Sequence, residues 1–241
     1  MTKIKGILGV IPARLASTRL PAKVLAPISG KPMVWWVWKK ASHLLVNVVV
    51  ATDHSRVKRT LEALGVPVVM TSRFCQSGTE RVAEVARRRL SRFYLNIQGD
   101  EPLMSQRTIR AVCRLMLEKR RGIFTAASVM KGKDSQNPHI VKVVPDKTNR
   151  AIYFSRSPVP YSPDPQALYW RHAGIYGYDR PTLLTVTALP LSNLEKREGL
   201  EQLRALDNGI PVWVARVSSG APAVDTAADL RQVRQFFKGA H

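Results

Sequence analysis

In the first half of the chain, short apolar runs alternate with segments whose apolar residues recur at helical spacing. The apolar runs lie at residues 7–11, 47–51, 66–70 and 93–97. The run at 47–51, NVVVA, is β-branched at its centre, as is typical of a buried parallel strand. The helical patterns cover residues 33–42, 55–64, 79–90 and 107–119. This order predicts an α/β fold with a doubly wound, mostly parallel sheet that helices cover on both faces.

Two of these helices open at residues that commonly cap helix N-termini. Ser55 begins the helix at 55–64, and Thr79 begins the helix at 79–90. Side-chain hydroxyls accept hydrogen bonds from the backbone N–H groups of a first turn. We therefore expect Ser55 and Thr79 to be the N-caps.

From about residue 125 the pattern changes to strand-like runs separated by turns rich in Pro, Asp and Asn. The runs lie at residues 124–130, 140–144, 151–154 and 174–178. They predict a lobe with a mixed or antiparallel sheet, inserted at about residues 125–190. A helix at 194–206, a strand at 212–217 and a helix at 227–237 then follow. We expect a single domain over residues 1–241 that contains this lobe.

The chain is strongly basic. It has 38 Lys and Arg residues against 17 Asp and Glu, a formal net charge of +21. Such a field attracts anions such as nucleotides, nucleic acids or acidic membranes. The densest clusters, residues 87–89 and 119–121, fall within or at the end of predicted helices and not in a low-complexity tail. This placement favours a solvated basic face, with no specific nucleic-acid partner.

Several classes of protein are disfavoured by what the sequence lacks. No apolar stretch approaches the roughly 20 residues of a membrane span, and the N-terminal apolar run breaks at Pro12 without a cleavage pattern. Cys75 and Cys113 form no C-x-x-C pair, and no two of the five histidines have metal-ligand spacing. We expect a cytoplasmic protein with no membrane insertion, no disulfide framework and no zinc site.

The loop after the first predicted strand carries candidate anion-binding residues. Residues 9–25 read GVIPARLASTRLPAKVL, so Arg14, Arg19 and Lys23 surround the small residues 16–18. Small residues let backbone N–H groups approach phosphate oxygens, and arginine forks add charge-assisted hydrogen bonds. The pattern suits a polyphosphate, although it is not a Walker loop. A basic surface loop is the alternative interpretation.

Carboxylates follow two more of the predicted strands. Asp53 follows the strand at 47–51, and Asp100 follows the strand at 93–97 in the sequence NIQGDEP. Ligands of doubly wound sheets bind at the carboxyl ends of strands, where Asp100 is able to present its carboxylate to Mg²⁺. Asp225 is a second candidate ligand, with a helix cap as the alternative. For Asp53 a structural role is favoured.

The second half of the chain has polar residues in two further patterns. His172 and Tyr176 lie in RHAGIYGY, where tyrosines alternate with apolar and glycine positions as on a strand; core packing is the alternative for Tyr176. Glu198 shares a helical face with Glu201 and Gln202 if the helix at 194–206 is continuous. That face is either solvated or a patch for sugar hydroxyls, which need paired donors and acceptors.

The order of these segments along the chain resembles a known family. In sequence they are IPARLASTRLPAKVL, GKPM, ATDH, QSGTERVAE, NIQGDEP, NPHIVKVV, YFSR, RHAGIYGY, LEQLR and VDTAADL. The series resembles the 3-deoxy-manno-octulosonate cytidylyltransferases, or CMP-Kdo synthetases, of Gram-negative lipopolysaccharide assembly, from residue 9 to about residue 233. The resemblance implies a nucleotidyltransferase domain with a sugar-binding lobe that also forms a homodimer. It implies that CTP and Kdo react to give CMP-Kdo and pyrophosphate.

The resemblance also implies roles for individual residues. The triphosphate would be held by Arg14, Ser17, Arg19 and Lys23. The cytosine would be approached by the segment 73–78, with Arg73, Gln76, Ser77 and Gly78, and Gln98 would lie near the nucleotide. Mg²⁺ would be coordinated by Asp100 and Asp225, which with Arg14, Arg19 and Lys23 form the implied catalytic set. The sugar acid would be bound by Arg156, His172, Tyr176, Glu201 and Gln202.

The chain departs from the family pattern at several positions. Ala22, Val24 and Ala223 stand where relatives commonly have Gly, Pro and Gly, and residues 162–170 are not closely matched. The sugar is therefore open between Kdo, 8-amino-Kdo and another 2-keto-3-deoxy sugar acid such as sialic acid. The charge of +21 is not a family property. A basic nucleic-acid-binding protein on a nucleotidyltransferase-like fold is the alternative from another class.

Overall fold

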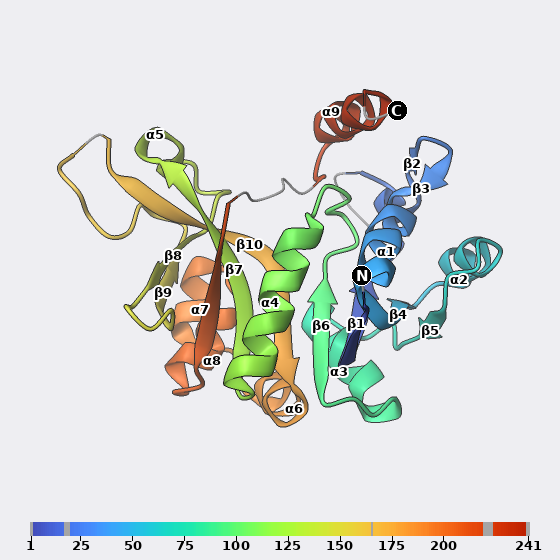
Figure 1. The fold of residues 1–241 in the computed structure, drawn as a ribbon, viewed down its shortest axis with the longest axis horizontal. Helices are drawn as coiled ribbons and strands as arrows, with labels where there is room; N and C mark the ends of the chain where they lie inside the picture. The colour runs from blue at the N-terminus through green and yellow to red at the C-terminus, as the bar shows by residue number, and fades with distance from the viewer. Residues whose placement is uncertain (1, 17–19, 165, 219–223, 240–241) are drawn as a thin grey trace. The chain divides into compact units, whose positions relative to one another are not determined.

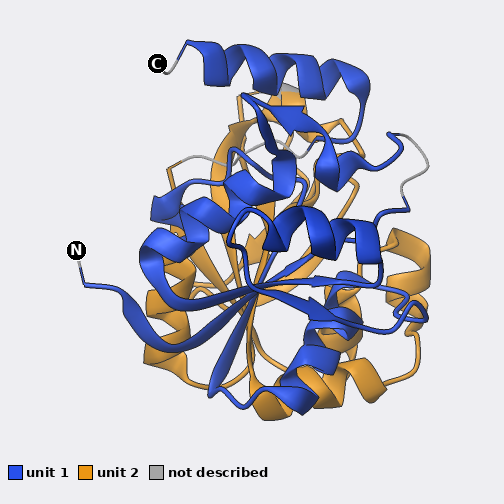
Figure 2. Ribbon diagram, turned by 90° about the vertical axis from the view of Figure 1, so that its right-hand side faces the viewer, with its two compact units in different colours: residues 1–109, 221–241 blue, residues 110–220 orange. Residues whose placement is uncertain are grey.

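A computed structural model describes residues 2–16, 20–164, 166–218 and 224–239 of the chain. The chain divides into two compact units, shown in separate colours in Figure 2. Unit 1 comprises Met1–Ile109 and Ala221–His241, and unit 2 comprises Arg110–Gly220. Helix α4 (Gln106–Lys119) begins in the first and ends in the second.

Unit 1 holds four parallel strands in the order β6-β1-β4-β5 (Figure 1). They are β1 (Ile4–Pro12), β4 (Leu45–Thr52), β5 (Val68–Met70) and β6 (Phe93–Ile97). The central residues of β1, β4 and β6 are buried, which explains why the sequence shows continuous apolar runs there and not alternation. Because the strands are parallel, the loops after β1, β4 and β6 leave the same edge of the sheet. The predicted doubly wound α/β fold is confirmed.

The helices and short elements of unit 1 are placed by buried apolar residues. They are η1 (Lys23–Leu25), β2 (Pro27–Ile28), β3 (Lys31–Pro32), α1 (Met33–Leu44), α2 (Ser55–Glu62), α3 (Gly78–Arg88) and α9 (Ala227–Lys238). Helix α9 packs on the β2–β3 hairpin through Leu230, Val233 and Phe237, which cluster with Ile28 and Met33. This cluster also contains Val224, so it anchors the residue immediately before Asp225.

Unit 2 has a mixed sheet, as the second-half pattern predicts. Its strands are β7 (Ile123–Lys131), β8 (Lys142–Pro145), β9 (Ala151–Ser155), β10 (Leu168–Asp179) and β11 (Val212–Val217). Strand β10 is antiparallel to β7 and β8, β9 is antiparallel to β8, and β11 is parallel to β7. The helices are α5 (Gly132–Ser135), α6 (Arg180–Ala188), α7 (Asn193–Glu198) and α8 (Gln202–Asp207).

Three local predictions are wrong. Nδ1 of His54, and not Ser55, accepts the capping hydrogen bond of α2 from Arg56 N at 3.1 Å. Ser77, and not Thr79, caps α3 by accepting from Glu80 N at 3.2 Å. The continuous helix expected at 194–206 is divided, because Gly199 takes a left-handed conformation with φ 62° and ends α7. In addition, α6 was not foreseen.

Candidate active site

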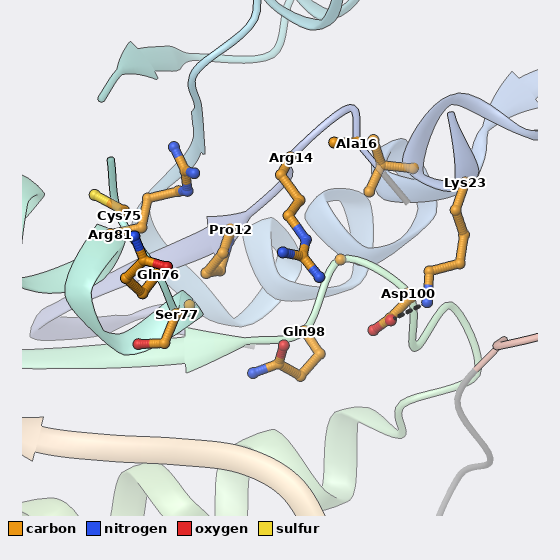
Figure 3. Close-up of a pocket in the computed structure, with 13 residues that line it drawn as sticks. Pro12, Arg14, Ala16, Lys23, Cys75, Gln76, Ser77, Arg81, Gln98 and Asp100 are labelled. Atoms are coloured by element: carbon orange, nitrogen blue, oxygen red, sulfur yellow. Dashed lines mark hydrogen bonds and ion pairs between the residues drawn. The ribbon is translucent and has the colours of Figure 1, made fainter. Parts of the chain in front are cut away.

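A cavity of about 260 Å³ lies in unit 1 where β1 and β6 end (Figure 3). Its lining residues come from the loops after these strands and from the start of α3: Pro12, Arg14, Ala16, Lys23, Val24, Cys75, Gln76, Ser77, Gly78, Arg81, Gln98, Gly99 and Asp100. The guanidinium of Arg14 and the amino group of Lys23 both point into it (Figure 3). The cavity therefore offers cations where doubly wound sheets bind ligands.

Most of the predicted nucleotide residues meet at this cavity. Arg14, Lys23, Gln76, Ser77, Gly78 and Gln98 all line it. Arg73 does not; its side chain is exposed, with the guanidinium carbon 5.2 Å from the centre of the Phe74 ring. Ser17 and Arg19 lie outside the described residues.

Close backbone approach brings the loop after β6 to the end of β1. A Cβ atom at Gly99 would lie 2.8 Å from the carbonyl oxygen of Pro12, inside normal contact distance. Only glycine lets the loop pass this close. The next residue is Asp100, so the close approach fixes the backbone position from which the Asp100 side chain extends.

The segment before α3 is held by carboxylates of that helix. Oε2 of Glu84 accepts hydrogen bonds from Ser72 N at 2.7 Å and from the Cys75 thiol at 3.3 Å. Oε2 of Glu80 accepts from Gln76 N at 2.7 Å. Burial, together with the hydrogen bond to Glu84, raises the pKa of Cys75 to about 11, so the thiol stays protonated near neutral pH. The cavity wall at 72–77 is therefore tied to α3.

Sequence reasoning missed these supporting residues, although one signal was available. Ser77 and Glu80 form the S-x-x-E spacing that marks helix starts. Arg81 was also missed; it is buried and its Nη2 lies 2.9 Å from Oδ2 of Asp53. Asp53 thus has the structural role that was favoured for it.

Two carboxylates converge on Lys23 at one end of the cavity. Its Nζ lies 2.5 Å from Oδ2 of Asp100, as Figure 3 shows, and 3.1 Å from Oδ1 of Asp225. Asp225 does not cap α9, because Thr226 accepts from Asp229 N and completes a capping box with that residue. A backbone hydrogen bond of 2.9 Å from Val224 N to Asp100 O joins the two carboxylate-bearing segments.

These residues fit a magnesium ion. The two carboxylates already face one cationic group, and Mg²⁺ commonly binds through one or two carboxylates with substrate phosphates and waters. Among the described residues no cluster of three or more His, Cys, Asp or Glu side chains has metal-site geometry. The site therefore suits a metal that arrives with phosphate oxygens better than a fully protein-ligated ion.

In unit 2, three of the five predicted sugar-binding residues lie together. The hydroxyl of Tyr176 donates to Oε1 of Gln202 at 3.2 Å, and the rings of Tyr176 and His172 have centroids 5.3 Å apart. Gln202 is buried, and its Nε2 has no hydrogen-bond partner among the described residues. An unmet buried donor costs free energy, so this amide is suited to an incoming acceptor.

His172 is kept neutral by its surroundings. Desolvation lowers its pKa to about 3, between the rings of Phe154 and Tyr176. Its Nε2 lies 2.9 Å from the hydroxyl oxygen of Thr125. A neutral imidazole is able to hydrogen-bond a sugar hydroxyl but brings no charge to a sugar carboxylate.

Arg156 is bound to backbone carbonyls, and the predicted face of Glu198 with Glu201 and Gln202 does not form. Nε of Arg156 donates to Glu198 O at 2.6 Å and Nη1 to Pro138 O at 3.0 Å. The Glu198 carboxylate instead accepts from Ser155 Oγ at 2.7 Å and Arg156 N at 2.8 Å. Glu201 stands at the N-cap of α8 and is partly exposed.

The buried Lys142 anchors the same region. Its Nζ donates to the carbonyls of Asn137 at 3.2 Å and Ile140 at 2.7 Å, and to that of Arg156. Burial lowers the pKa of this amine. Three donors meet three acceptors, so Lys142 fixes the backbone that carries Arg156.

The architecture places the chain among the nucleotidyltransferases. A cytidylyltransferase from Leptospira borgpetersenii shares the fold, with a TM-score of 0.66 at 15% identity over 97% of this chain and 87% of that one. The model of the family described as Cytidylyltransferase matches residues 8–214.

The more similar relatives narrow this class. The 3-deoxy-manno-octulosonate cytidylyltransferases of Koribacter versatilis and Myxococcus xanthus are each 41% identical, over 96% and 95% of this chain and 90% and 95% of their own lengths. A solved CMP:2-keto-3-deoxy-manno-octonic acid synthetase complexed with CTP superimposes with a TM-score of 0.94 at 37% identity, covering both chains completely. The chain belongs to the 3-deoxy-manno-octulosonate cytidylyltransferase family, which confirms the sequence resemblance.

Proposed function

We propose that the protein transfers CMP from CTP to Kdo, giving CMP-Kdo and pyrophosphate. The proposal rests on one observation: Lys23 forms ion pairs with Asp100 and Asp225 at a cavity that predicted nucleotide-binding residues line. The names of the relatives, and the CTP complex of one of them, support this choice of substrates.

The nucleotide would occupy the cavity of unit 1. Arg14 and Lys23 supply positive charge for the triphosphate, and we assign Ser17 and Arg19 to the same task. The segment 73–78 would contact the cytosine, since Gln76, Ser77 and Gly78 line the cavity at the start of α3. Backbone N–H groups at a helix start favour electron-rich ligand atoms. Gln98 adds a side-chain amide beside the nucleotide.

Asp100 and Asp225 would hold Mg²⁺ together with phosphate oxygens of the nucleotide. When bound, such an ion neutralises phosphate charge and lowers the pKa of a coordinated hydroxyl. Lys23 already lies between these carboxylates, so its ammonium group is placed to share the charge of the triphosphate. The residues of this chain therefore combine metal ligands and a fixed cation at one place.

The sugar acid would bind to the cluster of unit 2. Gln202 offers an unmet amide donor, Tyr176 a phenol and His172 a neutral imidazole, all of which suit sugar hydroxyls. Glu201 adjoins Gln202 at the start of α8 and would add an acceptor. Arg156 completes the proposed set as the cation for the carboxylate, although its guanidinium already donates to backbone carbonyls.

In the proposed reaction, the anomeric hydroxyl oxygen of the sugar forms a bond to the α-phosphorus of CTP. The bond between that phosphorus and the pyrophosphate oxygen breaks, and the hydroxyl proton is lost to solvent. Transfers of this kind need positioning and neutralisation of developing charge more than covalent chemistry. Arg14 and Lys23 would stabilise the pyrophosphate that leaves, and no general base is assigned.

The proposal extends to where and how the protein acts. We place it in the cytoplasm, in lipopolysaccharide biosynthesis, as a homodimer formed through unit 2. Apolar side chains exposed on its sheet, including Ile152 at 63% and Leu168 at 66%, support a buried surface between protomers. In the described part of the chain, no helix has both the length and the apolar character needed to cross a bilayer. Light scattering on the purified protein tests the dimer.

Pyrophosphate release from purified protein with CTP and Mg²⁺ tests the reaction. Freshly supplied Kdo, 8-amino-Kdo and sialic acid are compared in parallel. Release with Kdo that depends on both CTP and Mg²⁺ supports the proposal. A preference for 8-amino-Kdo or sialic acid would show that this sugar, and not Kdo, is the substrate. If folded protein binds CTP but releases no pyrophosphate with any of the sugars, the proposed activity is wrong.

A further inference from the structure

Five aromatic side chains form a continuous row across helices α1 and α9 of unit 1. Ring centroids are separated by 6.4 Å from Trp38 to Trp35, 5.0 Å from Trp35 to Trp36, 4.6 Å from Trp36 to Phe237 and 6.1 Å from Phe237 to Phe236. We call this row, with Lys31, Lys39 and Lys40, the aromatic-basic face. The proposed reaction uses none of these residues.

The inner rings of the row are fixed and the outer ones reach solvent. Phe237 is buried in the cluster beneath α9, and Trp36 Nε1 donates to Ile28 O at 2.8 Å. Phe236 is 61% exposed, while Trp35 and Trp38 are partly exposed. The row thus places one exposed phenyl ring and two partly exposed indole rings at the surface, and contiguous exposed apolar patches are typical of interaction sites.

Cations accompany the aromatic rings. Nζ of Lys31 and Nζ of Lys39 lie 5.7 Å and 5.9 Å from the centre of the Trp35 ring, and Nζ of Lys40 lies 5.8 Å from that of Phe237. Helix α9 adds the exposed Arg231 and Lys238.

Negative charge is scarce around this face. The chain has no Asp or Glu between Lys23 and Asp53, a stretch that includes all of α1. The acidic residue within α9, Asp229, is committed to the capping box with Thr226. Lys40 donates a hydrogen bond to the carbonyl oxygen of Pro102, and Glu101, the residue before Pro102, is buried. The face therefore presents positive charge that complements a polyanion.

We propose that the aromatic-basic face docks the protein on the surface of an anionic lipid bilayer. Phe236 and Trp35 would lie at the boundary between headgroups and acyl chains, where aromatic rings are favoured. Lys31 and Lys39, which flank the Trp35 ring, would face lipid phosphates. Each basic residue close to an anionic surface strengthens binding about fivefold. The attachment is peripheral, so it needs no membrane-spanning helix.

The same observations disfavour two other occupants. A second copy of the chain would bring a like-charged face against this one, within a protein of net charge +21. Single-stranded nucleic acids bind in grooves with stacking platforms. Trp38 lines one cavity in the described part of the chain, but no residue of α9 lines that cavity or the one in Figure 3, so Phe236, the exposed ring of the row, lies outside both.

Sedimentation of the full-length protein with lipid vesicles tests the proposal. Vesicles of phosphatidylcholine alone are compared with vesicles that contain about 30 mol% phosphatidylglycerol, at about 50 mM and about 300 mM salt. We expect binding to the anionic vesicles that weakens with salt, and no binding to the neutral ones. Binding of equal strength to both kinds of vesicle would overturn the role of charge.

Two matched pairs of variants locate the surface. The double variant Lys31→Gln with Lys39→Gln should weaken binding about 25-fold, as expected for two cations at about fivefold each. The double variant Arg56→Gln with Arg59→Gln removes the same charge from exposed positions on α2 and should leave binding within about twofold. Equal losses in both double variants would show that only the total charge matters and would overturn the proposal.

The apolar part of the face is tested separately. Phe236→Ser should weaken vesicle binding about 30-fold, which corresponds to the roughly 2 kcal/mol lost with the burial of one aromatic ring, and should reduce the blue shift of tryptophan emission. Leu191→Ser, at a side chain of unit 2 that is 57% exposed, is the control and should change neither. Turnover without vesicles should be normal in all variants, which confirms folding.

Two further results would overturn the proposal in favour of another occupant. Binding of a short RNA at physiological salt, tighter than binding to anionic vesicles and lost in Lys31→Gln with Lys39→Gln, would assign the face to nucleic acid. Concentration-dependent self-association that Phe236→Ser abolishes would assign it to a second copy.

Discussion

Nζ of Lys23 lies 2.5 Å from Oδ2 of Asp100, and the same nitrogen is 3.1 Å from Oδ1 of Asp225. The carboxylates come from separate elements, one after β6 and one before α9, so a single cation bridges two distant segments. Carboxylates that share a site repel each other unless positive charge lies between them. This arrangement is therefore adapted to positive charge, which Lys23 supplies in this structure and which Mg²⁺ would add in the proposed reaction.

Replacing Asp100 by Asn should abolish turnover while CTP still binds. The change removes one proposed metal ligand and leaves Arg14 and Lys23 to hold the triphosphate, so we expect kcat to fall at least about a hundredfold. Pyrophosphate release and calorimetric CTP binding measure the two effects. Asp207→Asn, at an exposed position of unit 2, is the control. Near-normal turnover of Asp100→Asn would remove this carboxylate from the mechanism.

Glu84→Gln should weaken CTP binding without affecting the sugar. The carboxylate holds Ser72 N and the Cys75 thiol, so its loss loosens the segment proposed to contact cytosine. We expect KM for CTP to rise about tenfold, the value of one charge-assisted hydrogen bond, and KM for Kdo to stay within about twofold.

The thiol gives this variant a readout that a purely structural defect would not share. Because Glu84 helps to raise the pKa of Cys75 to about 11, its neutralisation should speed alkylation of that thiol by iodoacetamide. Glu62→Gln, at the end of α2, is the matched control, since its carboxylate forms a long, exposed pair of 3.9 Å with Lys58. Equal increases in both KM values would refute the positioning role of Glu84.

Much of the fold was predictable because its signals are local. The strands at 93–97 and 212–217 have the predicted bounds, since buried β-branched and aromatic residues stop abruptly at polar turns. The placement of Arg14 and Asp100 followed from parallel strands alone, because their loops leave one edge of the sheet. Such inferences need only the order of elements.

Other features depend on contacts between distant parts of the chain. Asp225 and Thr226 are both good helix caps in sequence, and only the packing of α9 shows that Thr226 caps it while Asp225 meets Lys23. The break between α7 and α8 at Gly199 was not predictable from the sequence, because a glycine inside a helix costs only about 1 kcal/mol and is often tolerated. In the structure, the carboxylate of Glu198, the last residue of α7, accepts a hydrogen bond from Arg156 N, a contact between residues 42 positions apart that no local pattern reveals.

Gly99→Ala should lower activity by displacing Asp100. The added methyl group would lie 2.8 Å from Pro12 O, so the loop must move by a fraction of an ångström or more. Such a clash costs about 1–3 kcal/mol of stability, and misplacing a reacting group by about 1 Å costs about a hundredfold in rate. Gly239→Ala is the control because a methyl group there has its nearest neighbour at 3.9 Å. Activity equal to wild type would show that the close approach is dispensable.

Gln202→Leu should raise KM for Kdo about tenfold and leave KM for CTP unchanged. The substitution removes a buried amide whose Nε2 has no partner among the described residues and is proposed to donate to the sugar. It also removes the Oε1 atom that accepts from the Tyr176 hydroxyl, so the melting temperature should fall only by the equivalent of one hydrogen bond, about 1 kcal/mol. Gln136→Leu, at an exposed position, is the control. A large fall in melting temperature with equal effects on both KM values would identify Gln202 as structural.

His172 should make the protein less stable as the pH falls. Its folded pKa of about 3 lies below the unfolded value near 6.5, so between these values the unfolded state binds a proton that the folded state excludes. The free energy of unfolding therefore decreases with falling pH, by up to about 1.4 kcal/mol per pH unit from this group. His172→Gln lacks the titration, so its unfolding free energy should depend less on pH below about 6.5. Urea unfolding of both proteins between about pH 7.5 and pH 4.5 measures the difference, and parallel pH dependences would show that the imidazole is protonated in the folded state.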